Sequence, residues 1–127
     1  MPLASFKELI VWQRARVVVV QVYRLASIGR ISRDLGFRSQ IQRAAVSVMA
    51  NIAEGAERDN FREFAYLLRV AKASAGELRS HLILAGDLGF CHQEDIERLE
   101  DDLVQISSML TALIKRQVER SAYTRKA

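Results

Sequence analysis

The sequence contains one cysteine, one proline and two histidines among 127 residues. A single cysteine, Cys91, excludes an internal disulfide, and a single proline, Pro2, leaves no proline-rich linker between domains. The charge-free stretch at residues 44–53 has half of the roughly 20 residues that a membrane span needs. Lys7 and Glu8 also interrupt the N-terminal segment where a signal peptide requires an apolar run. We therefore expect a cytoplasmic protein that does not enter a membrane.

Residue sets for catalysis or metal binding are scarce as well. Di-metal sites in helix bundles use Glu-x-x-His pairs on two helices, but Glu77 precedes His81 by four residues and no second pair exists. Cys91 and His92 have no companion at zinc-ligand spacing. No glycine-rich phosphate loop is present, and two histidines leave little material for acid–base chemistry. We predict that the protein is not an enzyme and uses no metal or other cofactor.

Basic residues, by contrast, are plentiful and unevenly distributed. Nineteen basic and fifteen acidic residues give a net charge of +4. Residues 9–53 contain seven arginines and one acid, Asp34, whereas residues 94–102 contain six acids and one arginine, Arg98. The acidic block is expected at the start of a helix, where carboxylates favour the positive end of the helix dipole. The basic excess is weak evidence for an anionic partner.

The spacing of apolar residues predicts an all-α chain that forms a single domain over residues 1–127. Apolar positions recur at alternating intervals of three and four, which predicts helices at about 6–28, 35–57, 61–88 and 93–120. The β-branched run from Val17 to Val20 also fits a strand. We prefer a helix there because the apolar set is too long and has the wrong period for a strand. The basic end, Ser121 to Ala127, is expected to fray.

Short connections between these helices favour an antiparallel, up-down-up-down four-helix bundle. Asn60 and Glu63 form a capping box that begins the third helix, and Gly89 ends it. The first helix has a core stripe that includes Tyr23. It also has a second apolar set on its other side, formed by Leu9, Ile10, Val17 and Val20. Because one bundle seam cannot cover both sets, we expect the chain to self-associate into a closed homo-oligomer.

Two polar stripes accompany the predicted core. On the second helix, residues three or four apart lie on the face opposite the core: Gln40, Arg43, Ser47, Asn51, Glu54 and Arg58. On the third helix, Ser74, Glu77 and His81 share a flank. We interpret both stripes as polar groups that satisfy one another where helices or subunits meet. A ligand site is the less favoured alternative.

The third helix also has a basic ridge, formed by Arg62, Arg69, Lys72 and Arg79. At about 100° per residue these side chains fall on one flank of the core stripe, where Asp87 is the only acid. A solvated charged face explains such a run, and so does a track for phosphate groups. The ridge lacks the interleaved acids of most solvated faces, so both explanations stay open.

Several sequence motifs resemble a known family. They are Phe6-x-x-Leu9-x-Val11-Trp12-Gln13-x-Ala15, Gln40-Ile41-Gln42-Arg43-Ala44-Ala45-Val46-Ser47, Asn51-Ile52-Ala53-Glu54-Gly55, Glu63-Phe64, Ala71-x-x-Ser74-x-x-Glu77-Leu78 and Leu88-Gly89-Phe90. The chain is similar, from Phe6 to about Gln117, to the bacterial four-helix-bundle proteins encoded in intervening sequences of 23S ribosomal RNA genes. It departs from that family's usual pattern at Ile31-Ser32-Arg33-Asp34, where a proline and a glutamate are common, and after Gly55.

This resemblance implies an antiparallel four-helix bundle that assembles into a ring-like homopentamer. A related branch comprises the accessory variability proteins of diversity-generating retroelements, which are basic pentamers that bind nucleic acid and a reverse transcriptase. The resemblance carries over no catalytic residue. It matches polar signature positions at Gln40, Arg43, Ser47, Asn51, Glu54, Ser74 and Glu77. We expect an oligomer that binds RNA or DNA electrostatically; the alternative is a scaffold that assembles with a protein partner.

Overall fold

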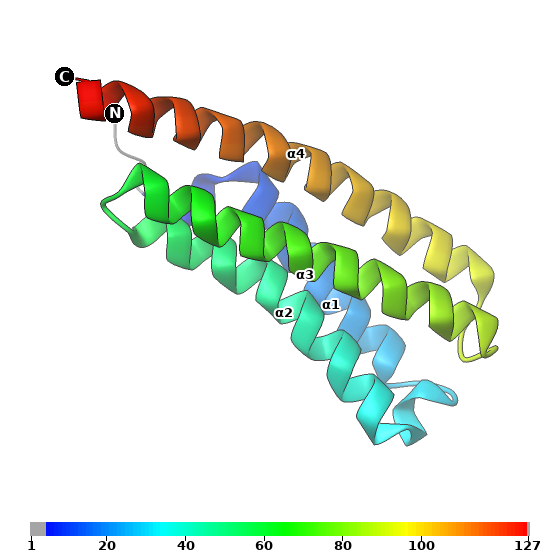
Figure 1. The fold of residues 1–127 in the computed structure, drawn as a ribbon. Coiled ribbons are helices and arrows are strands. Elements are labelled where there is room, and N and C mark those ends of the chain that lie inside the picture. The colour runs from blue at the N-terminus through cyan, green and yellow to red at the C-terminus, as the bar shows by residue number, and fades with distance from the viewer. Residues whose placement is uncertain (1–4, 127) are drawn as a thin grey trace.

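The computed structural model describes residues 5–126 and the side chains of residues 5–123. Over that range the chain is all-α, with four long helices and no strand, and it fits a four-helix bundle (Figure 1). The helices are α1 (Ile10–Ala26), α2 (Leu35–Glu57), α3 (Phe61–Asp87) and α4 (Gln93–Lys126). Two short 3₁₀ helices, η1 (Phe6–Glu8) and η2 (Ile31–Arg33), precede α1 and α2.

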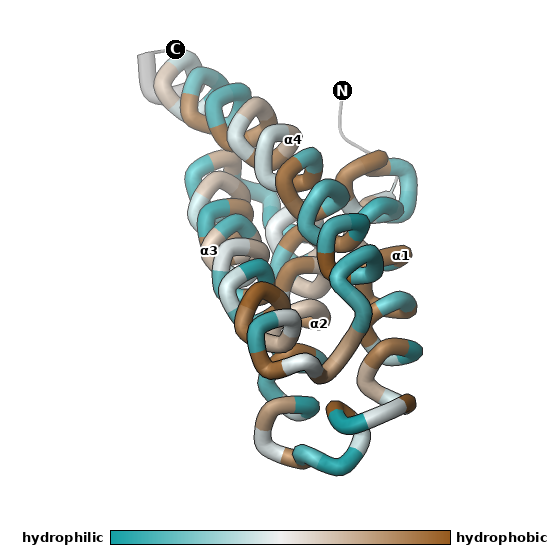
Figure 2. The backbone as a smooth tube through the Cα atoms, turned by 90° about the vertical axis from the view of Figure 1, so that its right-hand side faces the viewer, coloured by the Kyte–Doolittle hydropathy of each residue, from teal (hydrophilic) through white to brown (hydrophobic). Residues whose placement is uncertain are grey.

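Each helix packs against two others. The principal contacts join α1 to α2, α2 to α3, α3 to α4, and α4 back to α1. Apolar and polar segments alternate along the helices (Figure 2), and the apolar ones supply a single buried cluster. Its largest completely buried members come from every part of the bundle: Val22, Ile31, Ile41, Ile52, Leu68, Leu78, Leu82, Ile96, Leu103, Ile106 and Leu110. This amphipathic pattern is what the alternating apolar spacing predicts.

The predicted first helix, residues 6–28, is divided in the structure. The Ser5 hydroxyl accepts the Lys7 N–H at 3.2 Å and begins η1, while Leu9 adopts an extended conformation between η1 and α1. Helix α1 ends at Ala26, shortly before Gly29, whose φ of +63° is left-handed. The run from Val17 to Val20 is helical, which eliminates the strand alternative.

The other helix limits agree more closely with the sequence. Helix α2 covers the predicted residues 35–57, and α3 ends one residue early, before Gly89 at a φ of +70°. Asn60 caps α3 by accepting the Glu63 N–H at 3.0 Å. Helix α4 extends beyond residue 120 to Lys126, so the expected fraying from Ser121 is wrong up to that residue. Residues 121–126 contain no glycine or proline that would end a helix. Residue 127 lies outside the described range.

The outer side of α1 carries exposed apolar residues, as the two-sided pattern predicts. Ile10 is 63% exposed, Val17 53% and Val20 43%. Leu9, which was placed in the same set, instead packs against the core. Tyr23, predicted in the core stripe, is 46% exposed. Polar residues, including Gln13 and Arg24, lie on the same side of α1, so these exposed apolar side chains belong to a mixed surface.

None of the described helices is both long and apolar enough to cross a membrane.

Candidate nucleic-acid interface

The basic ridge on α3 is shorter in the structure than in the sequence. Arg62, Arg69 and Lys72 are exposed to solvent. Arg79 is half-buried, and its Nη2 lies 3.1 Å from Glu100 Oε1 of α4. This ion pair engages Arg79 with α4, so Arg79 differs from the other three predicted residues in having an internal partner. Arg62, Arg69 and Lys72 form the remaining basic ridge.

The ridge borders a crevice between α3 and α4. The crevice has a volume of about 200 Å³ and is lined by Arg62, Ala65, Arg69, Val118 and Ser121. Two arginines therefore line it together with the apolar Ala65 and Val118. Pockets for drug-sized ligands span about 300–1,000 Å³, so this space suits a fragment such as a phosphate group better than a whole cofactor.

The end of α4 adds a basic residue that the sequence analysis did not single out. Arg120 of α4 lies over the ring of Phe61, with its guanidinium carbon 5.7 Å from the ring centroid. The start of α3 and the last turns of α4 are therefore side by side, as Figure 1 also shows. The sequence does contain a signal for Arg120, because residues 115–120 include three basic residues. That signal becomes informative only once it is known that the end of α4 lies beside the start of α3.

The polar stripes meet between α2 and α3 rather than opposite the core. The Ser47 and Ser74 hydroxyl oxygens are 2.7 Å apart. The Asn51 Nδ2 amide donates to the Ser47 carbonyl at 2.8 Å and to the Ser47 hydroxyl at 3.0 Å. Ser74 is buried, and Ser47 and Asn51 are half-buried. This part of the set thus satisfies its own hydrogen bonds at a helix contact.

The rest of the polar set is exposed, except for the half-buried His81. Glu54 forms an ion pair of 2.8 Å with Arg58, and this hydrogen bond raises the pKa of the Arg58 guanidinium. Glu77 lies 3.7 Å from His81 Nε2. The remaining two members, Gln40 and Arg43, are exposed on α2. The structure therefore divides the predicted set into a hydrogen-bonded group and a solvent-facing group, and it does not form one continuous ladder.

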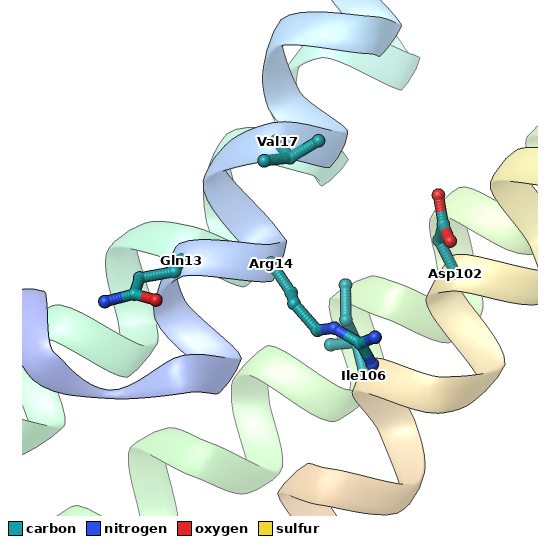
Figure 3. A pocket seen from close by; sticks show the side chains of 5 residues that line it. All are labelled: Gln13, Arg14, Val17, Asp102 and Ile106. Carbon is teal, nitrogen blue, oxygen red and sulfur yellow. The ribbon is translucent and has the colours of Figure 1, made fainter.

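A second crevice separates α1 from α4 (Figure 3). It has a volume of about 280 Å³ and is lined by Gln13, Arg14, Val17, Asp102 and Ile106. Arg14 extends from α1 toward α4, where its Nη1 donates to Gln105 Oε1 at 2.8 Å. The Arg14 guanidinium therefore already has a hydrogen-bond acceptor within the protein. We interpret this crevice as a gap between α1 and α4 that the Arg14 side chain bridges, and not as a ligand site.

Neither a nucleophilic site nor a metal-binding site formed by Cys91 and the acidic side chains is supported in the described residues. Burial raises the pKa of the half-buried Cys91 thiol, and the Asp95 carboxylate raises it further. A thiol with a raised pKa is a poor nucleophile at neutral pH. Among the described residues, no three His, Cys, Asp or Glu side chains come together as a metal site would require.

Comparison with known proteins agrees with this architecture. A crystal structure from Bacteroides thetaiotaomicron VPI-5482, of a protein with unknown function from the S23 ribosomal protein family, superposes with a TM-score of 0.76 at 23% identity. The match covers 84% of this chain and 99% of that one, and it shows a shared fold. No curated protein matches the sequence. Residues 7–112 match the family described as 23S rRNA-intervening sequence protein, and this chain belongs to that family.

Proposed function

We propose that this protein is a non-enzymatic, oligomeric nucleic-acid-binding protein of the cytoplasm, with RNA as the foremost ligand. The observation that carries the proposal is the basic ridge of Arg62, Arg69 and Lys72. All three side chains are exposed, and none of the ion pairs formed within residues 5–123 includes them. A charge cluster without internal partners is available for phosphate groups.

The dimensions of the ridge suit a nucleic-acid backbone. At about 1.5 Å per residue, the ten steps from Arg62 to Lys72 rise roughly 15 Å. A nucleic-acid strand carries a phosphate every few ångströms along its axis, so several phosphates fit within that length. Arginine guanidinium groups contact two phosphate oxygens at once. The proposed binding is therefore electrostatic and weakly selective for sequence.

A charge reversal tests this proposal. The variant Arg62→Glu/Arg69→Glu is compared with the control Arg30→Glu/Arg33→Glu, which makes the same change in net charge on the exposed connection between α1 and α2. Binding of a labelled RNA is measured by gel shift at several salt concentrations. We expect the ridge variant to lose at least about tenfold in affinity and to show a shallower salt dependence, because each lost phosphate contact lowers the salt slope by roughly one.

Equal effects of the two double variants would refute a role for the ridge. Adding Lys72→Glu to the ridge variant should weaken binding again. Light scattering and circular dichroism of every variant must match the unmodified protein, since loss of folding or assembly would also lower affinity. If the unmodified protein binds no RNA or DNA even at low salt, nucleic-acid binding itself is wrong.

The proposal includes self-association through the outer side of α1. The exposed Ile10, Val17 and Val20 support it, because exposed apolar side chains gathered on one side of a helix often mark a contact with another chain. Five subunits in a closed ring is the number that the family resemblance implies. An antiparallel order of helices is also part of the proposal. It is supported by the short connections, three residues between α2 and α3, and by the colour in Figure 1, which reverses from one helix to the next.

A scaffold that binds another protein is the second candidate. Exposed apolar residues near the end of α3 favour it: Ile83, Leu84 and Leu88 are each about 45% exposed. The same gel shift separates the two functions. A protein that assembles correctly but binds neither RNA nor DNA at low salt would favour the scaffold.

A further inference from the structure

Aromatic residues accompany the arginines where α3 begins. Tyr66 is 65% exposed, the highest value among the large apolar side chains of α3, and Phe61 is 41% exposed. Tyr66 follows Arg62 by four residues and precedes Arg69 by three. Side chains at these spacings are neighbours on a helix surface. The Tyr66 ring therefore lies between two basic residues of the ridge and has a face available for contact.

A second aromatic and arginine pair comes from the adjoining end of α4. Arg120 covers the Phe61 ring at 5.7 Å, and Tyr123 is 76% exposed. The crevice lined by Arg62, Arg69, Val118 and Ser121 lies between these two segments. Exposed rings, guanidinium groups and a recess thus occur together at one end of the bundle. This end, formed by Phe61, Arg62, Tyr66, Arg69, Arg120, Ser121 and Tyr123, is here named the aromatic–basic end.

Acidic residues also occur near this end, but none of the ion pairs formed within residues 5–123 includes Arg62 or Arg69. Glu63 lies in the same turn of α3 as Arg62, and its charge also raises the pKa of Arg58, the residue that follows α2. Asp59 is exposed in the connection before Phe61. Arg58 also pairs with Glu54. Glu119 is exposed, and it follows a basic pair, Lys115 and Arg116, in the last turns of α4. Arg62 and Arg69, which are exposed, are therefore available to phosphate groups beside the exposed Tyr66 ring.

From this arrangement we infer that the aromatic–basic end binds single-stranded nucleic acid in preference to duplex. The inference rests on the nucleic-acid binding proposed above and specifies its substrate class. Guanidinium groups attract the phosphates of either form. An exposed tyrosine ring adds affinity only when a base is free to stack on it, and in a duplex the bases are already stacked and paired. A recess of about 200 Å³ also admits a phosphate of a flexible strand more readily than one on a rigid, convex duplex.

The stacking residue is Tyr66. It has the largest exposure of the aromatic residues on α3 and is flanked by both arginines of the crevice. Stacking of one base on an aromatic side chain changes affinity by roughly 5- to 100-fold when the ring is removed. The hydroxyl of Tyr66 is not needed for stacking, since every base presents a face to the ring. Tyr66→Phe should therefore keep the affinity for single-stranded nucleic acid, whereas Tyr66→Ala should lower it.

The experiment measures fluorescence anisotropy of a labelled 20-nucleotide oligouridylate, and of a 20-base-pair RNA duplex, with the full-length protein at one salt concentration. Four proteins are compared: unmodified, Tyr66→Ala, Tyr66→Phe, and Leu84→Ala as a control. Leu84 is also exposed on α3 but lies about 27 Å away along the helix at 1.5 Å per residue. We expect the single strand to bind at least about tenfold more tightly than the duplex. Tyr66→Ala should remove most of that preference, and Tyr66→Phe and Leu84→Ala should preserve it.

The outcomes separate this inference from the proposed function. Duplex binding as tight as single-strand binding would overturn the single-strand preference while leaving nucleic-acid binding intact. Equal affinities of Tyr66→Ala and Leu84→Ala for the single strand would show that Tyr66 does not contact it. That result would also leave nucleic-acid binding intact. If neither nucleic acid binds to the unmodified protein, the proposed function fails and the inference fails with it.

Discussion

The hydroxyl oxygens of Ser47 in α2 and Ser74 in α3 lie 2.7 Å apart, and the Asn51 amide donates to the same Ser47 hydroxyl at 3.0 Å. This group links two helices at a site where Ser74 is buried. Since buried polar groups are costly without partners, the three residues stabilise the α2–α3 contact only as a set. Their role is structural, and it is distinct from that of the exposed Glu54 in the same stripe.

Replacing Asn51 should therefore destabilise the protein more than replacing Glu54. Asn51→Leu removes two hydrogen bonds to Ser47, and we expect it to lower the free energy of unfolding by about 1–3 kcal/mol. Glu54→Leu removes an exposed ion pair, which contributes little. Denaturant unfolding at one protein concentration measures both changes. Similar midpoints for Asn51→Leu and the unmodified chain would show that the two hydrogen bonds from Asn51 to Ser47 contribute nothing to stability.

Two glycines should respond in opposite directions to alanine. A Cβ at Gly55 would lie 2.7 Å from Phe64 Cδ1 and 3.2 Å from the Leu67 Cβ, so Gly55→Ala must displace packed side chains of α3. Such overpacking costs about 1–3 kcal/mol. A Cβ at Gly76 meets no atom within 4 Å, and alanine in an exposed helix interior is favoured by roughly 0.5–1 kcal/mol. Thermal unfolding should rank Gly76→Ala above the unmodified protein and Gly55→Ala below it; the reverse order would contradict the close α2–α3 approach.

Cys91 should react slowly with thiol reagents in the folded protein. Burial and Asp95 both raise its pKa above the ordinary value of 9.0, so the thiolate is scarcer in the folded chain than in the unfolded chain at any pH up to that range. A raised thiol pKa stabilises the fold below pH 9 and loses this contribution as pH rises further. Iodoacetamide labelling at pH 8 should be slower for native than for denatured protein. Equal rates would place the thiol in an exposed, unperturbed environment.

Much of the fold follows from local sequence signals. The three-and-four spacing predicted α2 at its observed limits, and Asn60 and Gly89 marked both ends of α3 because capping and left-handed turns depend on neighbouring residues. The break at Leu9 was not predicted, since the residues on both sides of it are compatible with a helix. Ile31 was also missed as a core residue: it is completely buried, but it lies in a connection where no periodic pattern exists.

The candidate site depends on tertiary contacts, and the sequence predicted less of it. Helical phase placed Arg62, Arg69 and Lys72 on one flank, where they lie exposed. The same phase could not show that Glu100 lies within 3.1 Å of Arg79, because the two residues belong to different helices. The pairing of Arg120 with Phe61 likewise depends on how the ends of α3 and α4 are packed. The sequence predicted which basic residues share one face of a helix, but it did not predict which residues of a different helix they contact.

The last prediction concerns self-association through α1. Val17 and Val20 lie on its exposed outer side at 53% and 43% exposure. If this side is a subunit contact, a carboxylate there would be buried without a partner, at a cost of several kcal/mol. Val17→Asp should therefore convert the oligomer to smaller species without loss of helix content. Five chains of 14.4 kDa give 72 kDa for the proposed pentamer, and multi-angle light scattering measures the change directly.

Val118→Asp is the matched control for this experiment. Val118 is 42% exposed, close to the value for Val20, but it lines the crevice that must stay open if nucleic acid is to enter it. An aspartate at that position should leave the mass unchanged and lower the affinity for RNA, because it adds a negative charge beside Arg62 and Arg69. Circular dichroism should show the same helix content for both variants. A monomeric mass for the unmodified protein at micromolar concentration would end the self-association proposal, and an unchanged mass for Val17→Asp would move the subunit contact away from α1.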